Sequence, residues 1–154
     1  MALNQNQFVQ IPVQGQLDLR FNGQTVSCQV DSSSAGSLVP GQAVKMVDSA
    51  GGVPKVVECA ADEDDVFGFI NFDQKNQSFA VGDRVEISAM RNNVMYMTAG
   101  AAIARNAEVM IVVASKKVVT ATSTNRIVGR AFDKAAADGD LIRVVIDLPG
   151  ALKA

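Results

Sequence analysis

Two stretches of the chain follow one pattern: Val81-Gly82-Asp83-Arg84-Val85-Glu86-Ile87 and Asp138-Gly139-Asp140-Leu141-Ile142-Arg143-Val144. In each, a Gly-Asp pair leads into alternating apolar and polar residues. Glycine supplies the backbone freedom of a tight turn, and strict alternation is typical of a half-buried β-strand. A third stretch, Pro40-Gly41-Gln42-Ala43-Val44, repeats the turn and the start of the strand. The repeat is architectural, and it predicts short antiparallel strands in a sandwich or barrel.

The first predicted hairpin turns at Asn22-Gly23, the strongest two-residue type I′ signal. A two-residue loop there pairs Leu19 with Val26 and Leu17 with Cys28. Both pairs place apolar residues on one face, as a fixed register requires. Cys28 is therefore expected to pack as a small hydrophobic residue.

Two more hairpins are predicted, one at Gly51-Gly52 and one at Asn92-Asn93. The register expected for the former places Met46 opposite Val57 and gives agreeing apolar and opposite-charge pairs. Further strands are expected at residues 108–114 and 117–122, and short helical turns at residues 133–137 and 101–105. The Ser-rich stretch at residues 31–36 has the composition of a linker. It divides the chain into an N-terminal arm plus hairpin, residues 1–36, and a β-domain, residues 37–154.

The composition excludes several classes of chemistry. The 154 residues contain no histidine, which removes Ser-His-Asp triads, histidine general bases and histidine-ligated metal sites. The net charge of −2 argues against a general nucleic-acid binder. Aromatic residues make up 5% of the chain, which is few for a surface that stacks sugars or bases. No apolar run is long enough to cross a membrane, and no signal peptide is recognised, so synthesis in the cytoplasm of a cell is expected.

The most conspicuous polar feature is the cluster Asp62-Glu63-Asp64-Asp65. Consecutive carboxylates on a strand point to opposite faces, whereas a calcium loop needs spaced oxygen ligands. A solvated loop is the favoured interpretation. No phosphate loop, nucleophile elbow or dinucleotide motif is present, so we expect no catalytic residues, no cofactor and no metal.

The first sixteen residues carry no charge and contain five glutamines. The apolar side chains among them are costly to leave in water. Two interpretations stay open: a disordered terminus, or an arm that is mobile in the free protein and is ordered against another protein by strand addition. The candidate contact residues of such an arm are Phe8, Val9, Ile11 and Val13.

A second candidate contact surface surrounds the Asn92-Asn93 turn. Adjacent residues of a strand cannot all face one core, so part of this apolar cluster should be covered by another subunit. The predicted interface residues are Met90, Met95, Tyr96 and Met97.

From about Leu38 onward the chain resembles phage head decoration proteins, also called capsid cement proteins. Three stretches carry the resemblance: residues 38–44, residues 79–85, and residues 127–132 taken together with residues 139–144. The last of these, a Val-Gly-small-aromatic strand, an Ala-rich turn and a Gly-Asp strand, is the most characteristic. Residues 1–36 lie outside the resemblance.

The resemblance implies an all-β, jelly-roll-like or tulip-shaped domain, here with an extended N-terminal arm. It further implies a homotrimer on the capsid surface of a virion, bound to the major capsid protein and bracing the head against internal pressure. Neither nucleic acid nor membrane is an expected partner. Two alternatives remain: a sugar- or receptor-binding module of a phage fibre or cell surface, and a β-barrel hydrolase that uses carboxylates.

Overall fold

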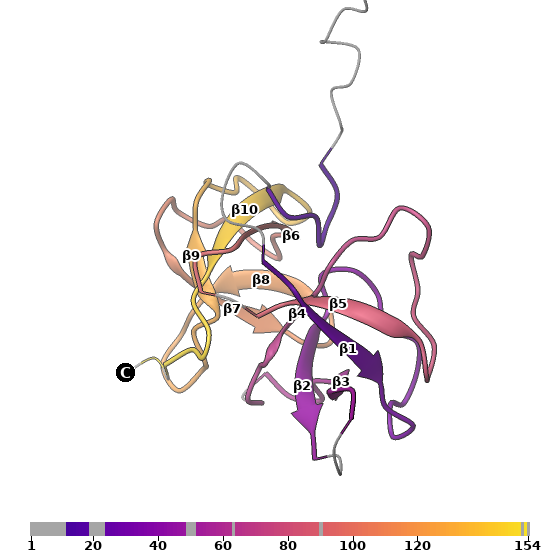
Figure 1. Ribbon diagram of the computed structural model, residues 1–154. Coiled ribbons are helices and arrows are strands. Elements are labelled where there is room, and N and C mark those ends of the chain that lie inside the picture. The colour runs from indigo at the N-terminus through magenta and orange to yellow at the C-terminus, as the bar shows by residue number, and fades with distance from the viewer. Residues whose placement is uncertain are drawn as a thin grey trace, which may run out of the picture.

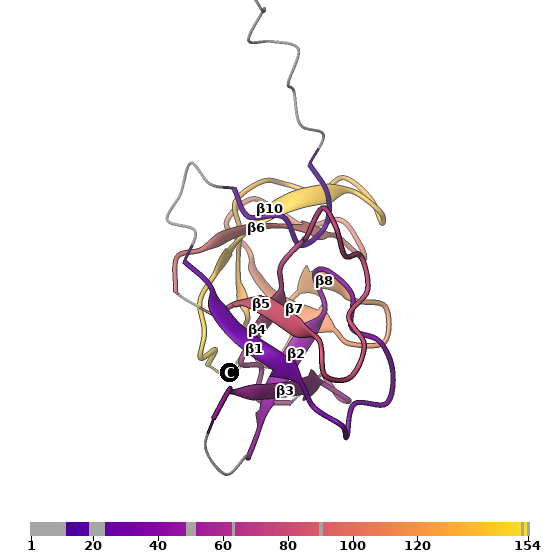
Figure 2. The same cartoon turned by 45° about the vertical axis from the view of Figure 1, so that its right-hand side comes forward.

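The computed structural model describes residues 12–18, 24–48, 52–62, 64–89, 91–151 and 153. Within these ranges the secondary structure consists of ten strands and no helix, which confirms the all-β prediction (Figure 1). None of the described segments is a helix long and apolar enough to span a membrane. The strands form two sheets, which lie at the lower right and at the upper left of Figure 1; Figure 2 gives a second view of the same arrangement.

The first sheet is a closed barrel with the strand order β1-β3-β2-β4-β5. Antiparallel pairing of β1 with β5 closes it, and the β1–β3 pair is parallel. Its strands are β1 (Val26–Val30), β2 (Ala43–Val47), β3 (Lys55–Glu58), β4 (Gly68–Ile70) and β5 (Arg84–Ser88).

The second sheet is antiparallel throughout, with the order β6-β10-β9-β7-β8. A bridge between Ala99 and Val118 links the end of β6 to β8, so the two outer strands of this sheet also meet. Its strands are β6 (Val94–Thr98), β7 (Glu108–Val112), β8 (Lys117–Thr120), β9 (Gly129–Ala131) and β10 (Leu141–Ile146).

Two apolar clusters hold the sheets together. One fills the barrel and includes Cys28, Phe79 and Ile87. The other belongs mainly to the second sheet, but it includes Phe69 of β4, which is fully buried, and Cys59. The barrel therefore contributes side chains to the core of its neighbour, and the two halves are packed as one body.

The Gly-Asp repeat is a set of identical turns. Gly82 and Gly139 have φ values of 88° and 91°, in the left-handed region that glycine tolerates. In each turn the following aspartate accepts a hydrogen bond from the amide three residues earlier: Ala80 N to Asp83 Oδ2 at 2.8 Å, and Ala137 N to Asp140 Oδ2 at 3.0 Å. These turns confirm the predicted repeat.

The same turn occurs at residues 39–42 and, beyond the prediction, at residues 13–16. Gly15 and Gly41 both have a φ of 79°. The glutamine after each glycine accepts a hydrogen bond from the amide three residues earlier, with distances of 3.2 Å for Gln16 and 3.1 Å for Gln42. The two turns are packed so closely that a Cβ atom on Gly15 would lie 2.6 Å from the amide nitrogen of Gly41. The N-terminal segment therefore enters the fold through an element of the body's own repeat.

The predicted pairing of the first hairpin is wrong. Cys28 lies opposite Val85 of β5, and Leu17 lies opposite Met95 of β6. The turn Asn22-Gly23 and Leu19 lie outside the described residues. The strand after the turn is used to close the barrel, and the segment before it covers the other sheet. The division into residues 1–36 and 37–154 stays a prediction, although β1 is bonded to strands beyond that boundary.

The second hairpin forms, but its register differs by one residue from the prediction. Met46 lies opposite Val56, where Val57 was expected, and Val47 lies opposite Lys55. Val47 and Lys55 end the two strands, so the connection between them is longer than the predicted two-residue loop. Val56 is fully buried inside the barrel while Met46 is 46% exposed.

The third predicted hairpin is a crossover. β5 belongs to the barrel and β6 to the second sheet, so the Asn92-Asn93 segment joins the two halves. Asn93 is 1% exposed, and its side-chain amide donates to the Gln24 carbonyl oxygen at 2.6 Å and to Ser88 Oγ at 2.7 Å. These bonds hold the crossover against the barrel.

Of the remaining strand and turn predictions, one is confirmed and two are wrong. β7 and β8 form the hairpin expected within residues 108–122. The two expected helical turns are extended segments, because Ile103 and Ala135 form a β-bridge with each other.

Candidate functional site

The N-terminal segment is added as a short strand to the open side of β6. Gly15 N donates to the Tyr96 carbonyl oxygen at 2.7 Å, Tyr96 N donates to that of Gln16 at 2.8 Å, and Asp18 N donates to that of Val94 at 2.8 Å. Residues 15–18 are therefore part of the folded body. Of the predicted arm residues, Phe8, Val9 and Ile11 lie outside the described residues, while Val13 is half-buried in a surface groove with Phe72 and Lys116.

A charged cluster holds this segment to β10. The Arg143 guanidinium donates two hydrogen bonds of 2.8 Å to the two carboxylate oxygens of Asp133. It also lies 3.5 Å from Asp18 Oδ2 and 4.4 Å from the centre of the Phe132 ring. The hydrogen bonds from Arg143 outweigh the effect of burial and hold the pKa of Asp133 below its usual range. We call Asp18, Phe132, Asp133 and Arg143 the Arg143 clamp.

The predicted interface residues occupy different environments. Met95 and Met97 have no exposed surface and pack in the core of the second sheet. Tyr96 is half-buried on the opposite face, beside the N-terminal segment. Met90 lies outside the described residues. The two methionines thus pack within the chain. The subunit interface stays a prediction, and among its described residues only Tyr96 has exposed surface with which to contact another subunit.

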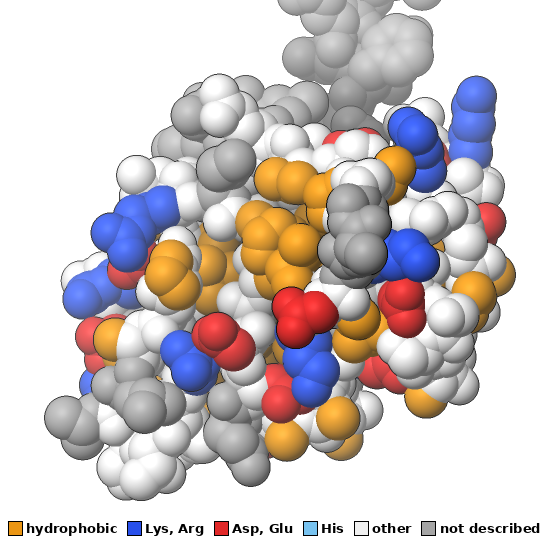
Figure 3. Space-filling view, turned by 60° about the horizontal axis from the view of Figure 1, so that its bottom comes forward, with side chains coloured by type: hydrophobic (Ala, Val, Ile, Leu, Met, Phe, Trp, Pro, Cys, Tyr) orange, Lys and Arg blue, Asp and Glu red, His pale blue; other side chains and the backbone are white. Residues whose placement is uncertain are grey.

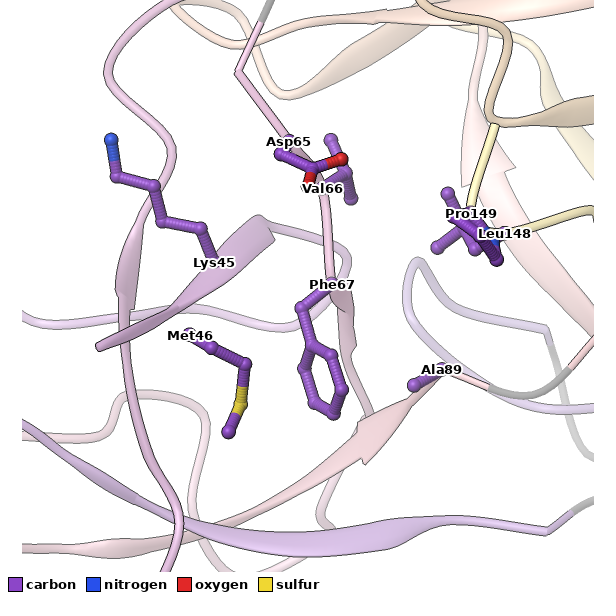
Figure 4. A pocket seen from close by; sticks show the side chains of 8 residues that line it. All are labelled: Lys45, Met46, Asp65, Val66, Phe67, Ala89, Leu148 and Pro149. Atoms are coloured by element: carbon purple, nitrogen blue, oxygen red, sulfur yellow. The ribbon is translucent and has the colours of Figure 1, made fainter. Parts of the chain in front are cut away.

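An apolar groove of about 450 Å³ lies where the barrel meets the second sheet. Met46 and Phe67 stand side by side on the barrel side, and Leu148 and Pro149 face them from the end of the chain (Figure 4). Lys45 and Asp65 form its polar border. Figure 3 shows hydrophobic side chains gathered at the centre of one face of the molecule, bordered by charged ones. Such a surface is suited to contact with another protein.

The acidic cluster joins parts of the chain. Asp62 accepts a hydrogen bond from Val113 N at 2.7 Å, Asp64 pairs with Lys45 at 3.1 Å, and Asp65 lies 3.3 Å from Arg126. Burial acts to raise the pKa of Asp64, but hydrogen bonds from two backbone amides and from Lys45 outweigh this effect. The pKa of Asp64 therefore lies below its usual value. Asp62 and Asp64 are half-buried, so the expectation of a solvated loop is wrong for them. Within the described ranges, no three acidic or thiol side chains converge as metal ligands would.

Both cysteines are free and buried, in different cores. Burial raises the pKa of Cys28 to about 11 and that of Cys59 to about 12. Neither thiol is ionised at neutral pH, which agrees with the packing role expected for Cys28.

The sequence pattern of the phage structural cement proteins (E217 gp24/Pam3 gp6) matches residues 5–147. The chain belongs to this family. The match covers nearly the whole chain, including the N-terminal segment, whereas the resemblance seen in the sequence began only at about Leu38. A cement protein is a structural component of the virion that stabilises the capsid.

A solved structure supports the fold of this cement protein. The crystal structure of the head fiber gp8.5 N base in bacteriophage phi29 is similar with a TM-score of 0.51 and 12% sequence identity. The alignment covers 80% of this chain and 93% of that one. No curated protein matches the sequence.

The sequence did not predict the Arg143 clamp. It also did not predict the apolar groove between the barrel and the second sheet, which we call the junction groove. The members of the clamp are separated by up to 125 positions, so no local motif marks them. The available signal was an acidic residue, Asp133, shortly before a strand that carries Arg143.

Proposed function

We propose that this cement protein binds the outer surface of the phage head as a symmetric homotrimer and contacts the major capsid protein. The protein acts by binding alone and has no enzymatic turnover. The absence of histidine from the chain supports this reading, as does the structural character of the family. Many moderate contacts multiplied by symmetry suffice for such a role.

The placement of residues 13–18 carries the proposal. The turn packed against residues 39–42, three backbone hydrogen bonds to β6 and the Arg143 clamp hold residues 13–18 on the folded body, and residues 1–11 precede this segment in the sequence. Phe8, Val9 and Ile11 are apolar, and no charged group accompanies them, so their burial against a neighbour carries no charge-desolvation cost. These residues and Val13 form the proposed capsid-binding arm.

Removing residues 1–11 tests the arm while keeping every described contact. The truncated protein should retain the circular dichroism and thermal stability of the full chain but bind more weakly to heads assembled without cement protein. A variant with Phe8, Val9 and Ile11 changed to serine should behave like the truncated form. Equal binding by all three proteins would show that the arm makes no contact with the head.

The oligomeric state is tested separately by sedimentation equilibrium at micromolar concentration. A trimer supports the proposal, and Tyr96→Ala should then shift the equilibrium toward smaller species. A monomer both in solution and on heads would contradict it.

Screening against glycosides, esters and nucleotides tests the absence of turnover. Activity that disappears on substituting Asp62, Asp64 or Asp65 would favour the hydrolase alternative instead.

A further inference from the structure

A second groove, of about 380 Å³, lies on the barrel between β5 and the segment that follows β4. Phe72 and the buried Phe79 provide its apolar lining. Lys75, Arg84 and Glu86 are exposed at its border, and Asp73 there is half-buried. This groove has no lining residue in common with the apolar groove of Figure 4, but it shares Phe72 with the groove that holds Val13 of the N-terminal segment.

The charged side chains of this groove differ in whether they have hydrogen-bond or ion-pair partners. Asp73 accepts hydrogen bonds from Lys75 N at 2.9 Å and from Asn76 Nδ2 at 3.1 Å, so its carboxylate closes the local turn. Glu86 accepts a hydrogen bond from Thr25 Oγ1 at 2.7 Å. The side chains of Lys75 and Arg84, by contrast, have no ion-pair or hydrogen-bond partner among the described residues. Lys75 and Arg84 thus keep their N–H donors available to an incoming carboxylate, whereas Asp73 and Glu86 keep their negative charge because their hydrogen-bond donors are uncharged.

The floor of the groove lacks a hydrogen-bond donor. Asn71 is 9% exposed, and its side-chain oxygen has no partner among the described residues. Asn71 Oδ1 has almost no accessible surface, so an incoming N–H group reaches it only if the Asn71 side chain turns toward the groove. The new hydrogen bond would then satisfy an acceptor that is costly to leave unpaired. Peptide backbone supplies such groups along its whole length.

From these observations we propose that the groove docks an extended peptide segment carrying one Asp or Glu side chain, presented by the protein shell of the head. The carboxylate is bound between Lys75 and Arg84, and an apolar neighbour in the segment packs on Phe72. Asp73 and Glu86 disfavour a polyanion such as nucleic acid, because a row of phosphates would meet both carboxylates at close range. This inference rests on the proposed function and adds a second contact, on the barrel, to that of the arm.

The first experiment measures binding to heads assembled without cement protein. Lys75→Glu/Arg84→Glu should bind about tenfold more weakly than the unaltered protein, and the loss should shrink as salt is raised. Lys134→Glu is the matched control, because Lys134 is also exposed and lies outside the groove. If the double variant binds as tightly as the control, the groove is not a docking site. If the unaltered protein does not bind heads at all, the proposed function fails first.

The second experiment identifies the partner directly. A carbodiimide joins a lysine amine to a carboxylate that touches it, and mass spectrometry then locates both ends. On decorated heads, Lys75 should be joined to an Asp or Glu of a head shell protein, and Lys75→Arg should abolish the product while retaining binding. A cross-link from Lys75 to a second copy of this chain would overturn the assignment, as would cross-links confined to carboxylates of its own chain.

Discussion

Replacing Arg143 with leucine should destabilise the fold by about 2–3 kcal/mol. The substitution removes both guanidinium hydrogen bonds to Asp133, the contact with Asp18 and the stacking on Phe132. Loss of one partner of a fully buried pair costs about 3–5 kcal/mol. The Arg143 and Asp133 side chains retain 21% and 28% exposure, so partial hydration of the Asp133 carboxylate lowers that cost, although the Asp18 side chain is only 4% exposed. Leucine keeps much of the apolar contact of the arginine stem.

The pH dependence distinguishes this ion-pair loss from a simple packing defect. The folded state holds the pKa of Asp133 below that of the unfolded chain, where it is about 4. The stabilisation is therefore complete above about pH 4 and is lost as the pH falls through the lower folded-state pKa. The stability difference between the unaltered protein and Arg143→Leu should be constant from pH 5 to 8 and should shrink toward pH 2.

Urea unfolding followed by circular dichroism measures the difference, because the chain has no tryptophan for fluorescence. Arg130→Leu is the control: Arg130 lies 3.4 Å from Glu108 and is 54% exposed, so its loss should cost under about 0.5 kcal/mol. If Arg143→Leu costs no more than the control, or if its cost is the same at pH 3 and pH 7, the clamp does not stabilise the fold by charge pairing.

Three further predictions concern the interior. Phe69→Ala should cost about 3–5 kcal/mol in urea unfolding, because this fully buried side chain fills the core shared by barrel and second sheet; a cost below 1 kcal/mol would contradict the packing. Gly129→Ala should destabilise strongly, since its Cβ would lie 2.2 Å from the Val145 carbonyl oxygen, whereas Gly36→Ala, with open space around it, should be neutral by the same assay. Cys28 and Cys59 should resist iodoacetamide at pH 8 in the folded protein and react in urea, because burial raises the pKa of both thiols; modification of either in the native state would show that its core opens readily.

Local patterns in the sequence were sufficient for the turns and for one hairpin. The Gly-Asp turns form because glycine at a positive φ and a side-chain acceptor three residues from an amide are local requirements. The β7–β8 hairpin forms because both strands belong to the same sheet and adjacent strands are the easiest to pair.

The Asn92-Asn93 crossover and the register of β2 and β3 depend on contacts between distant parts of the chain. Asn92-Asn93 is a good turn signal, and the chain does change direction there. It passes into the other sheet because Asn93 is bonded to Gln24 and Ser88 of the barrel, which a local pattern cannot show. The predicted register of β2 and β3 maximised apolar and opposite-charge pairs. In the observed register only Met46 and Val56 pair apolar with apolar, while Val44 and Val47 lie opposite Glu58 and Lys55.

The candidate contact surfaces were predictable only in part. The apolar character of Phe8, Val9 and Ile11 is visible in the sequence, but the fixed entry point at residues 13–18 is not. Alternation correctly placed Tyr96 on the face opposite Met95 and Met97. It could not show that the chain itself buries both methionines, because this depends on strands that pair with β6 from far along the sequence.

Closure of the two sheets bears on how the protein accumulates before it is used. A head requires many copies, and an open strand edge at high concentration invites strand-to-strand polymerisation. Here β1 and β5 close the barrel, residues 15–18 occupy the outer side of β6, and the Ala99–Val118 bridge brings β6 against β8. With these described edges already paired, subunits offer fewer open strand edges through which copies could polymerise.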